Sequence, residues 1–181
     1  MQTEILIAGF GGQGVLFAGQ LLAYAAMDAG KEVTWIPSYG PEMRGGTANC
    51  TVIISDEEIG SPTVRNPAAV IAMNLPSLDK YEPLVKAGGV LVVNTSLIKR
   101  AVLRSDVRPV LIDANTAAEQ LGNQRLANMV LLGGLLANLP VIKMEQLEEA
   151  IRLHTPQRHQ KLVPLNLQAL ELGAKHLAPA F

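Results

Sequence analysis

This 181-residue chain opens with a short apolar segment that runs directly into a glycine-rich turn and then into a long Ala/Leu helix. Residues 3–8 are almost wholly apolar, which is typical of a central parallel strand covered on both faces. Apolar residues then recur at helical spacing from 13 to about 29, and Gly30 supplies a stop signal. With a further strand predicted at 32–36, the pattern indicates a βαβ unit.

The turn between the first strand and the first helix has the spacing GxGxxG. Such a turn lets a phosphate approach bare backbone N–H groups at the positive end of the helix. Tight strand-to-helix turns also favour glycine without a ligand, and this structural interpretation stays open. A nicotinamide site needs Asp or Glu near the end of the second strand, but residues 34–38 read Thr-Trp-Ile-Pro-Ser, and no Gly-Lys-Ser/Thr follows the turn. A dehydrogenase and a P-loop enzyme are therefore disfavoured.

The rest of the chain continues the alternation of strands and helices. A β-branched strand at 48–54 is followed by acidic residues that suit a hairpin turn and by a short strand at Ile59, which predicts an antiparallel insertion. Thr116 and Glu119 have the spacing of a capping box, and Gly133-Gly134 would let another backbone approach closely. Further strands are predicted at 68–73, 90–93 and 110–112, and further helices at 77–85, 126–139, 144–153 and 164–177.

These elements predict the fold class. We expect one α/β domain over residues 1–181, with a Rossmann-like, mainly parallel sheet and helices on both faces. The antiparallel hairpin insertion and a helical C-terminus complete it. No linker, repeat or low-complexity segment interrupts the chain.

Composition narrows the possible partners. The 16 acidic and 15 basic residues nearly cancel in net charge, so no strong electrostatic field would attract nucleic acid or an acidic membrane. Charged residues make up only 17% against a usual figure of about 25%, which predicts that other subunits cover part of the surface. Cys50 is the only cysteine, which excludes an internal disulfide and an iron–sulfur cluster held by this chain alone. With no leader pattern and no apolar run of about 18 residues, we expect a cytoplasmic protein.

No catalytic set is evident in the sequence. The histidines all lie in the C-terminal helical part and are interpreted as solvated helix residues away from the strand ends. Polar residues do follow the predicted strands, where open α/β sheets bind ligands, but single residues of this kind equally form helix caps or turns. No metal-ligating cluster or nucleophile–base arrangement emerges, so we assign no catalytic and no metal-binding residue. The histidines are His154, His159 and His176, and the polar residues that follow the predicted strands are Asn74, Asn94 and Asp113.

A second loop, residues 38–46, reads Ser-Tyr-Gly-Pro-Glu-Met-Arg-Gly-Gly. Tyr39 and Arg44 are residue types that anchor protein interfaces, and Gly45 and Gly46 offer backbone N–H groups to an anion. The alternative is a simple turn in which Glu42 and Arg44 satisfy each other. The sequence does not decide between these two interpretations.

Taken in order, four segments resemble the gamma subunit of the 2-oxoacid:ferredoxin oxidoreductases. They are Gly-Phe-Gly-Gly-Gln-Gly at 9–14, the loop at 38–46, Ile-Gly-Ser-Pro at 59–62 and Ala-Met-Asn at 72–74, and the resemblance runs through at least 4–138. The segment Met-Arg-Gly-Gly-Thr-Ala-Asn-Cys at 43–50 is most similar to the 2-oxoglutarate type.

The resemblance implies a complex that converts a 2-oxoacid and coenzyme A to acyl-CoA and carbon dioxide and passes electrons to ferredoxin. It implies alpha, beta and delta partner subunits, which hold thiamine diphosphate, magnesium and iron–sulfur clusters, while this chain is not itself catalytic. A free-standing nucleotide-binding or redox-sensing protein and a purely structural module are the alternatives. The loops at 9–14 and 39–47 are expected to lie beside each other at the strand ends. Residues expected to contact coenzyme A or another subunit are Gly9, Gly11, Gly12, Gln13, Gly14, Tyr39, Arg44, Gly45, Gly46 and Thr47.

Overall fold

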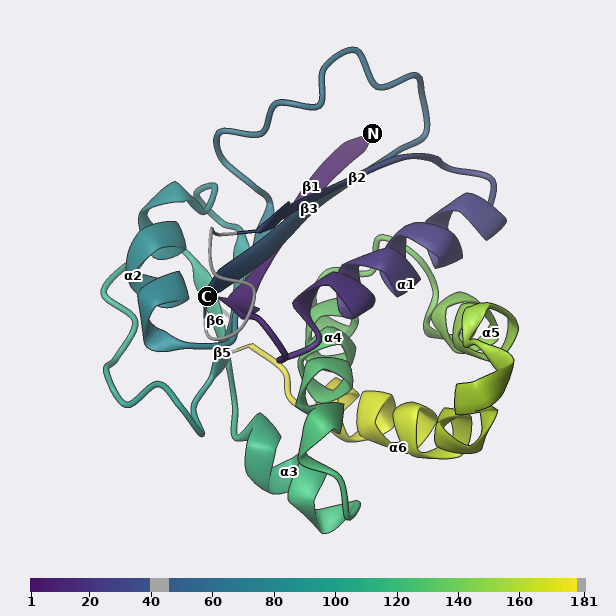
Figure 1. Cartoon of the computed structure of the whole chain (residues 1–181). Coiled ribbons are helices and arrows are strands. Elements are labelled where there is room, and N and C mark those ends of the chain that lie inside the picture. Colours follow the sequence, from purple (N-terminus) through teal and green to yellow (C-terminus); the bar gives the residue numbers. More distant parts are fainter. Residues whose placement is uncertain (40–45, 179–181) are drawn as a thin grey trace.

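A computed structural model describes residues 1–39 and 46–178, and its centre is a mixed sheet with helices on both faces (Figure 1). Within the described residues the sheet has six strands in the order β2-β3-β1-β4-β5-β6. The pairs β1–β4, β4–β5 and β5–β6 are parallel, whereas β3 is antiparallel to both β1 and β2. The strands are β1 (Gln2–Phe10), β2 (Glu32–Tyr39), β3 (Thr47–Ser55), β4 (Ala69–Ala72), β5 (Val90–Asn94) and β6 (Arg108–Ile112).

The predicted strand, turn and helix at the start of the chain are confirmed. β1 leads into α1 (Val15–Asp28), and Gly30, with φ of 76°, ends the helix in the left-handed conformation that glycine favours. β2 then runs in the same direction as β1, as a βαβ unit requires. The two strands are not neighbours, however, because β3 lies between them and pairs with both. Chain reversal after β2 therefore inserts the antiparallel strand that the sequence predicted.

The position of the hairpin differs from the prediction. β3 turns back from β2, not toward a strand at Ile59, and the residues around Ile59 form no strand in the described chain. β2 and β3 pair over eight positions, from Glu32 opposite Ser55 to Tyr39 opposite Ala48. Apolar side chains at alternate positions on both strands pack on α1, which fixes the register. The acidic segment instead begins a long connection to β4.

Helices cover the two faces of the sheet unequally (Figure 1). The larger core cluster lies under α1, α4, α5 and α6, and the smaller cluster lies under α2 on the opposite face. Among the described residues, no helix is long and apolar enough to cross a membrane. The remaining α-helices are α2 (Leu75–Tyr81), α3 (Ala114–Gln120), α4 (Ala127–Asn138), α5 (Met144–His154) and α6 (Val163–Ala174), joined by the short 3-10 helices η1 (Glu82–Leu84), η2 (Gln124–Leu126) and η3 (Gln157–Leu162).

Two local predictions about the helices had opposite outcomes. The close approach at Gly133 is confirmed, because its α-carbon faces the backbone of Leu170 in α6, where a methyl group would overlap the carbonyl. The capping box of Thr116 and Glu119 is wrong. α3 begins at Ala114, directly after the end of β6, so Thr116 lies inside the helix.

Candidate functional site

The carboxyl edge of the sheet gathers the polar residues that follow the parallel strands. The glycine turn follows β1, Asn74 follows β4, Asn94 ends β5, and Asp113 follows β6. Because these four strands are parallel neighbours, their ends meet at one edge, where open α/β sheets place ligands. We therefore take this edge as the candidate site.

Two glycines of the turn adopt backbone conformations that other residues rarely adopt. Gly12 has φ of 95° and Gly14 has φ of 75°, and Gly14 is the N-cap of α1. No side chain caps the helix, and its first turn contains no acidic residue. Within the described residues, the positive end of α1 is therefore not neutralised by a carboxylate of its own helix, which favours an anion or a partner's acidic group.

Gln13 folds back into the turn. Its Oε1 accepts a hydrogen bond from the backbone N–H of Phe10 at 2.6 Å and from Asn74 Nδ2 at 3.3 Å. A side chain at Gly9 would collide with Gln13 Oε1, so glycine at position 9 makes room for this contact. The side-chain oxygen of Gln13 thus stabilises the turn from inside and links it to the end of β4.

Buried amides continue from the turn across the sheet edge. Asn74 caps α2, because its Oδ1 accepts from the N–H of Ser77 at 2.9 Å. Asn94 is 1% exposed, and its Nδ2 donates to Asn115 Oδ1 at 2.9 Å. Of the two interpretations that the sequence left open for these residues, the helix cap holds for Asn74.

Asp113 lies at the outer end of this edge. Ser96 Oγ donates to its carboxylate, and this hydrogen bond is the main reason why the pKa of Asp113 lies below its usual value. The side chain of Asp113 makes no N-capping hydrogen bond to α3. Its contact with Ser96 instead ties the end of β6 to the segment after β5.

The second loop of the sequence returns to the glycine turn. Phe10 is opposite Thr47 in the β1–β3 ladder, and the N–H of Gly11 donates to the carbonyl of Gly46 at 2.9 Å. The predicted neighbourhood of the two loops is confirmed at these residues. Tyr39 ends β2, but its side chain and residues 40–45, which include Glu42, Arg44 and Gly45, lie outside the described part of the chain.

Two cavities adjoin the glycine turn. A cavity of about 180 Å³ lies beside Gln13, Asn94 and Asn115. A cavity of about 280 Å³ lies between the start of α1, the start of α4 and η3. Both cavities share Gly12 and Arg125, so they lie on either side of the same turn.

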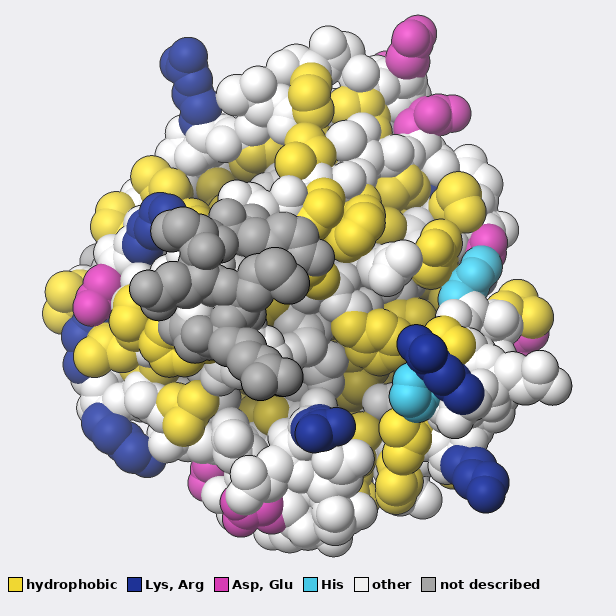
Figure 2. All heavy atoms as spheres, viewed as in Figure 1, with side chains coloured by type: hydrophobic (Ala, Val, Ile, Leu, Met, Phe, Trp, Pro, Cys, Tyr) yellow, Lys and Arg dark blue, Asp and Glu magenta, His cyan; other side chains and the backbone are white. Residues whose placement is uncertain are grey.

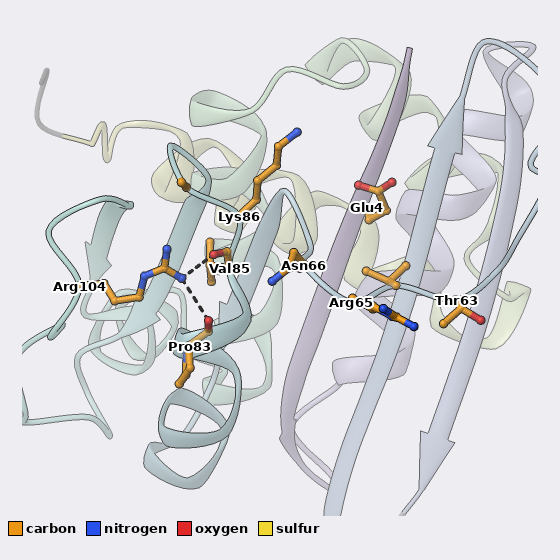
Figure 3. Close-up of a pocket in the computed structure, with 10 residues that line it drawn as sticks. Glu4, Thr63, Arg65, Asn66, Pro83, Val85, Lys86 and Arg104 are labelled. Atoms are coloured by element: carbon orange, nitrogen blue, oxygen red, sulfur yellow. Dashed lines mark hydrogen bonds between the residues drawn. The ribbon is translucent and has the colours of Figure 1, made fainter.

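A larger cleft of about 570 Å³ lies near the opposite edge of the sheet (Figure 3). Arg65 and Lys86 line it with Glu4 of β1. The guanidinium of Arg104 points to the main-chain carbonyls of Pro83 and Val85, as the dashed lines show. Because Arg104 also pairs with an aspartate, it holds neighbouring loops together and is not free for a ligand.

The interpretation of the histidines as solvated helix residues is confirmed for His159, which is exposed in η3, but its expected separation from the strand ends is wrong. His159 lines the 280 Å³ cavity together with Gly12 and Gly14 of the turn that follows β1. Local sequence carries no signal for this placement, because the residues come together only when α6 packs on α4. His154 stacks on Tyr24 at 4.2 Å between ring centroids.

Cys50 is buried in β3 against α1. Burial raises the pKa of its thiol to about 12, and Sγ donates to the carbonyl of Val15 at 3.6 Å. An iron–sulfur cluster needs several accessible thiolates, so this residue does not fit as a cluster ligand. The described residues include no group of three or more His, Cys, Asp or Glu placed to hold a metal ion.

Comparisons with known proteins agree with the fold. The family model for pyruvate ferredoxin/flavodoxin oxidoreductase matches residues 4–176. The chain is 39% identical over 174 residues to the ketoisovalerate oxidoreductase subunit VorA of Methanothermobacter marburgensis, covering 96% of this chain and 36% of VorA. It thus spans about a third of that relative. It is 36% identical over 184 residues to the 2-oxoglutarate synthase subunit KorC of the same organism, covering 96% of this chain and 95% of KorC.

Solved structures show the same arrangement. A keto/oxoacid ferredoxin oxidoreductase gamma subunit from Geobacter sulfurreducens has a TM-score of 0.82 at 34% identity and matches 96% of both chains. A 2-oxoglutarate:ferredoxin oxidoreductase from Magnetococcus marinus, solved with 2-oxoglutarate, coenzyme A and succinyl-CoA, has a TM-score of 0.86. At 24% identity, with 96% of this chain and 30% of that chain covered, this second likeness shows the fold alone.

The resemblance to gamma subunits of 2-oxoacid:ferredoxin oxidoreductases that the sequence motifs indicated is confirmed. The mainly parallel sheet with helices on both faces is also the fold of the solved gamma subunit. Because the family model and relatives above 30% identity cover nearly the whole length, the chain belongs to the pyruvate ferredoxin/flavodoxin oxidoreductase family.

Proposed function

We propose that this chain is the gamma subunit of a 2-oxoacid:ferredoxin oxidoreductase of the 2-oxoglutarate type. The complex would convert 2-oxoglutarate and coenzyme A to succinyl-CoA and carbon dioxide, with the electrons passing to ferredoxin. The observation that carries this proposal is the match to KorC, which extends over nearly the full length of both chains. In this proposal, partner chains supply the rest of the enzyme.

The chemistry would take place on those partners. Alpha, beta and a ferredoxin-like delta subunit would hold thiamine diphosphate, magnesium and the iron–sulfur clusters. The buried Cys50, as the single cysteine of the chain, supports this division of labour, since it cannot supply a cluster by itself. A cytoplasmic location belongs to the same proposal and is checked by fractionating the native cells.

The glycine turn and the second loop would form the surface that faces the partners or coenzyme A. The hydrogen bond from Gly11 to Gly46 and the uncapped start of α1 support this assignment, because they place bare backbone and a positive helix end at one edge. The residues that the family resemblance singled out for contact with coenzyme A or another subunit belong to this proposed surface. These residues are Gly9, Gly11, Gly12, Gln13, Gly14, Tyr39, Arg44, Gly45, Gly46 and Thr47.

Purification of the tagged full chain from its native extract tests the assignment. We expect it to co-purify with chains that carry thiamine diphosphate and iron–sulfur clusters. The purified complex should reduce ferredoxin when both 2-oxoglutarate and coenzyme A are present. A chain that purifies alone and binds a dinucleotide tightly by calorimetry would instead support a free-standing nucleotide-binding protein.

A matched pair of threonine substitutions tests the surface itself. Thr47→Arg places a bulky cation on an exposed residue beside the glycine turn, and Thr63→Arg does the same at the cleft near the other edge. We expect Thr47→Arg to lower retention of partner subunits or ferredoxin reduction while Thr63→Arg leaves both unchanged. Equal behaviour of the two variants would contradict the placement of the surface.

A further inference from the structure

The 180 Å³ cavity beside Gln13, Asn94 and Asn115, here named the amide cavity, lies where the sheet changes its winding direction. The crossover from β1 through α1 leads to β2 on one side of β1, whereas the crossover from β4 through α2 leads to β5 on the other side. α1 and α2 accordingly cover opposite faces of the sheet. Gln13 follows β1, Met73 follows β4, and both line the amide cavity. Open α/β sheets bind ligands at such a point, outside the carboxyl ends of the strands.

The orientation of the Gln13 amide is fixed by its neighbours. Its Oε1 accepts from the backbone N–H of Phe10 at 2.6 Å and from Asn74 Nδ2 at 3.3 Å. Asn74 is 3% exposed, and it cannot reverse its own amide because its Oδ1 accepts from the N–H of Ser77 at 2.9 Å. Both contacts thus hold the oxygen of Gln13 inside the turn. Its Nε2, which makes no hydrogen bond to a described residue and stays accessible, is the polar atom left for the amide cavity.

The orientation of the Asn115 amide is fixed in the same way. Its Oδ1 accepts from Asn94 Nδ2 at 2.9 Å. Asn94 is 1% exposed and is held by the backbone, because its Nδ2 also donates to the carbonyl of Met73 at 3.4 Å and its Oδ1 accepts from the N–H of Ser96 at 3.3 Å. Asn115 Nδ2 makes no hydrogen bond to a described residue and stays accessible. Two buried amides therefore fix two amides of the cavity wall as N–H donors before any ligand binds.

The charge around these donors favours an anionic oxygen group. None of the described residues that line the amide cavity is acidic. Gln124, the remaining amide of the described lining, is exposed and donates to Glu119 instead. Arg125 also lines the cavity, and Figure 2 shows a Lys or Arg side chain over the start of α4. Paired N–H donors without an acceptor of their own suit the oxygens of an anion, and a nearby positive charge strengthens such contacts.

The size of the amide cavity limits the ligand to a small group. A water molecule occupies about 30 Å³ in the liquid, and sites for larger ligands usually exceed about 300 Å³. A phosphate carries up to about two negative charges, more than one lining arginine offsets. Met73 and Ala127 add apolar wall that suits a short hydrocarbon. We propose that the amide cavity binds a carboxylate group with a short aliphatic body, with Gln13 Nε2 and Asn115 Nδ2 as its donors.

NMR titration of the isotope-labelled full chain tests this proposal, with propionate as the probe and its neutral isostere propionamide as the matched control. The side-chain amide signals of Gln13 and Asn115 should shift saturably with propionate. Propionamide should bind at least about tenfold more weakly because it lacks the charge. Coenzyme A and inorganic phosphate are titrated alongside. Shifts with either of these but not with propionate, or no saturable shift with propionate, would overturn the proposal.

Two isosteric variants separate a binding role from a structural one. Gln13→Glu and Asn115→Asp each keep an oxygen that accepts from the neighbouring amide and replace only the outward donor, so their loss of signal also assigns the two amides. We expect the melting temperature to change by less than about 3 °C while propionate binding falls at least about tenfold. Gln20→Glu, in α1 but outside the amide cavity, should leave binding unchanged. Unchanged binding in the two isosteric variants, or an equal fall in Gln20→Glu, would contradict the assigned donors.

Purification of the tagged Gln13→Glu chain from native extract distinguishes two sources of the carboxylate, and this step alone rests on the proposed function. An acidic side chain of a partner subunit in the amide cavity would be repelled by the new charge, so partner chains would be lost. A small metabolite as the ligand predicts that the partners are retained although propionate binding is lost. A parent chain that purifies without partners would count against the proposed function and leave the propionate titration valid.

Discussion

Asn128 Nδ2 donates a hydrogen bond of 3.1 Å to the carbonyl of Gly14, joining the start of α4 to the turn before α1 across 114 positions of the chain. Asn128 is 5% exposed, so the contact lies inside the protein. It places two helix N-termini side by side. The geometry of the glycine turn therefore depends on α4 as well as on its own sequence.

Gly14→Ala should destabilise the protein more than Gly12→Ala. Both residues have positive φ, which costs a residue other than glycine about 1–2 kcal/mol. A methyl group at Gly14 would also overlap the amide of Asn128, whereas the space at Gly12 is open. We expect losses of about 2–4 and about 1–2 kcal/mol in the free energy of unfolding, measured in urea. Equal losses would show that Asn128 does not constrain the turn.

Gly173→Ala should be among the most damaging single-methyl changes in this chain. The added carbon would overlap the backbone carbonyl of Val130 where α4 and α6 pack together, and backbone has little room to shift. We expect a loss of about 3 kcal/mol or more. Gly60→Ala, in open space, should change the free energy of unfolding by less than about 0.5 kcal/mol. A mild effect of Gly173→Ala would mean that the two helices are not in backbone contact.

Glu82 holds the loop around residues 100–104, and its neutralisation should loosen that loop. Its side chain is 3% exposed, pairs with Arg100 at 2.8 Å and accepts from the N–H of Arg104 at 3.0 Å. Glu82→Gln removes the charge that faces Arg100, so we expect a loss of about 2–3 kcal/mol. Asp79, the other partner of Arg100, is largely exposed, so Asp79→Asn should cost less than about 1 kcal/mol. Similar costs for the two variants would contradict the buried role of Glu82.

Cys50 should resist alkylation in the folded protein. With a pKa of about 12, its thiolate fraction at pH 8 is roughly a thousandfold below that of an ordinary thiol, and burial blocks access further. Mass spectrometry after iodoacetamide treatment should find the native chain unmodified and the urea-unfolded chain with one adduct. Rapid modification of the native chain would show that the β3–α1 interface opens readily.

The local elements were largely predictable from the sequence, because short-range periodicity and turn residues encode them. The strand, turn and helix from Gln2 to Asp28 follow directly from such signals. The hairpin and the cap of α3 were not predictable in detail. Whether a strand pairs with the one before it or the one after it depends on packing against α1, and Thr116 has capping chemistry at a position that the end of β6 places inside a helix.

The candidate site was predictable in part. The neighbourhood of Gly11 and Gly46 followed from two loops at adjacent strand ends, and the hydrogen bond between them confirms it. The contact of Gln13 with Asn74 and the place of His159 beside the glycine turn carry no local signal. Each requires segments that are far apart in the chain to be brought together.

By itself the sequence determined the opening strand–turn–helix, the apolar character of the sheet and, through an ordered set of motifs, the family. Tertiary structure alone decided that β3 separates β1 from β2, that amide side chains link the strand ends, and that His159 lies beside the glycine turn. The physical reason is range. Backbone propensity and periodicity act over a few residues, whereas strand order, burial and unpaired polar groups are set by contacts between distant segments.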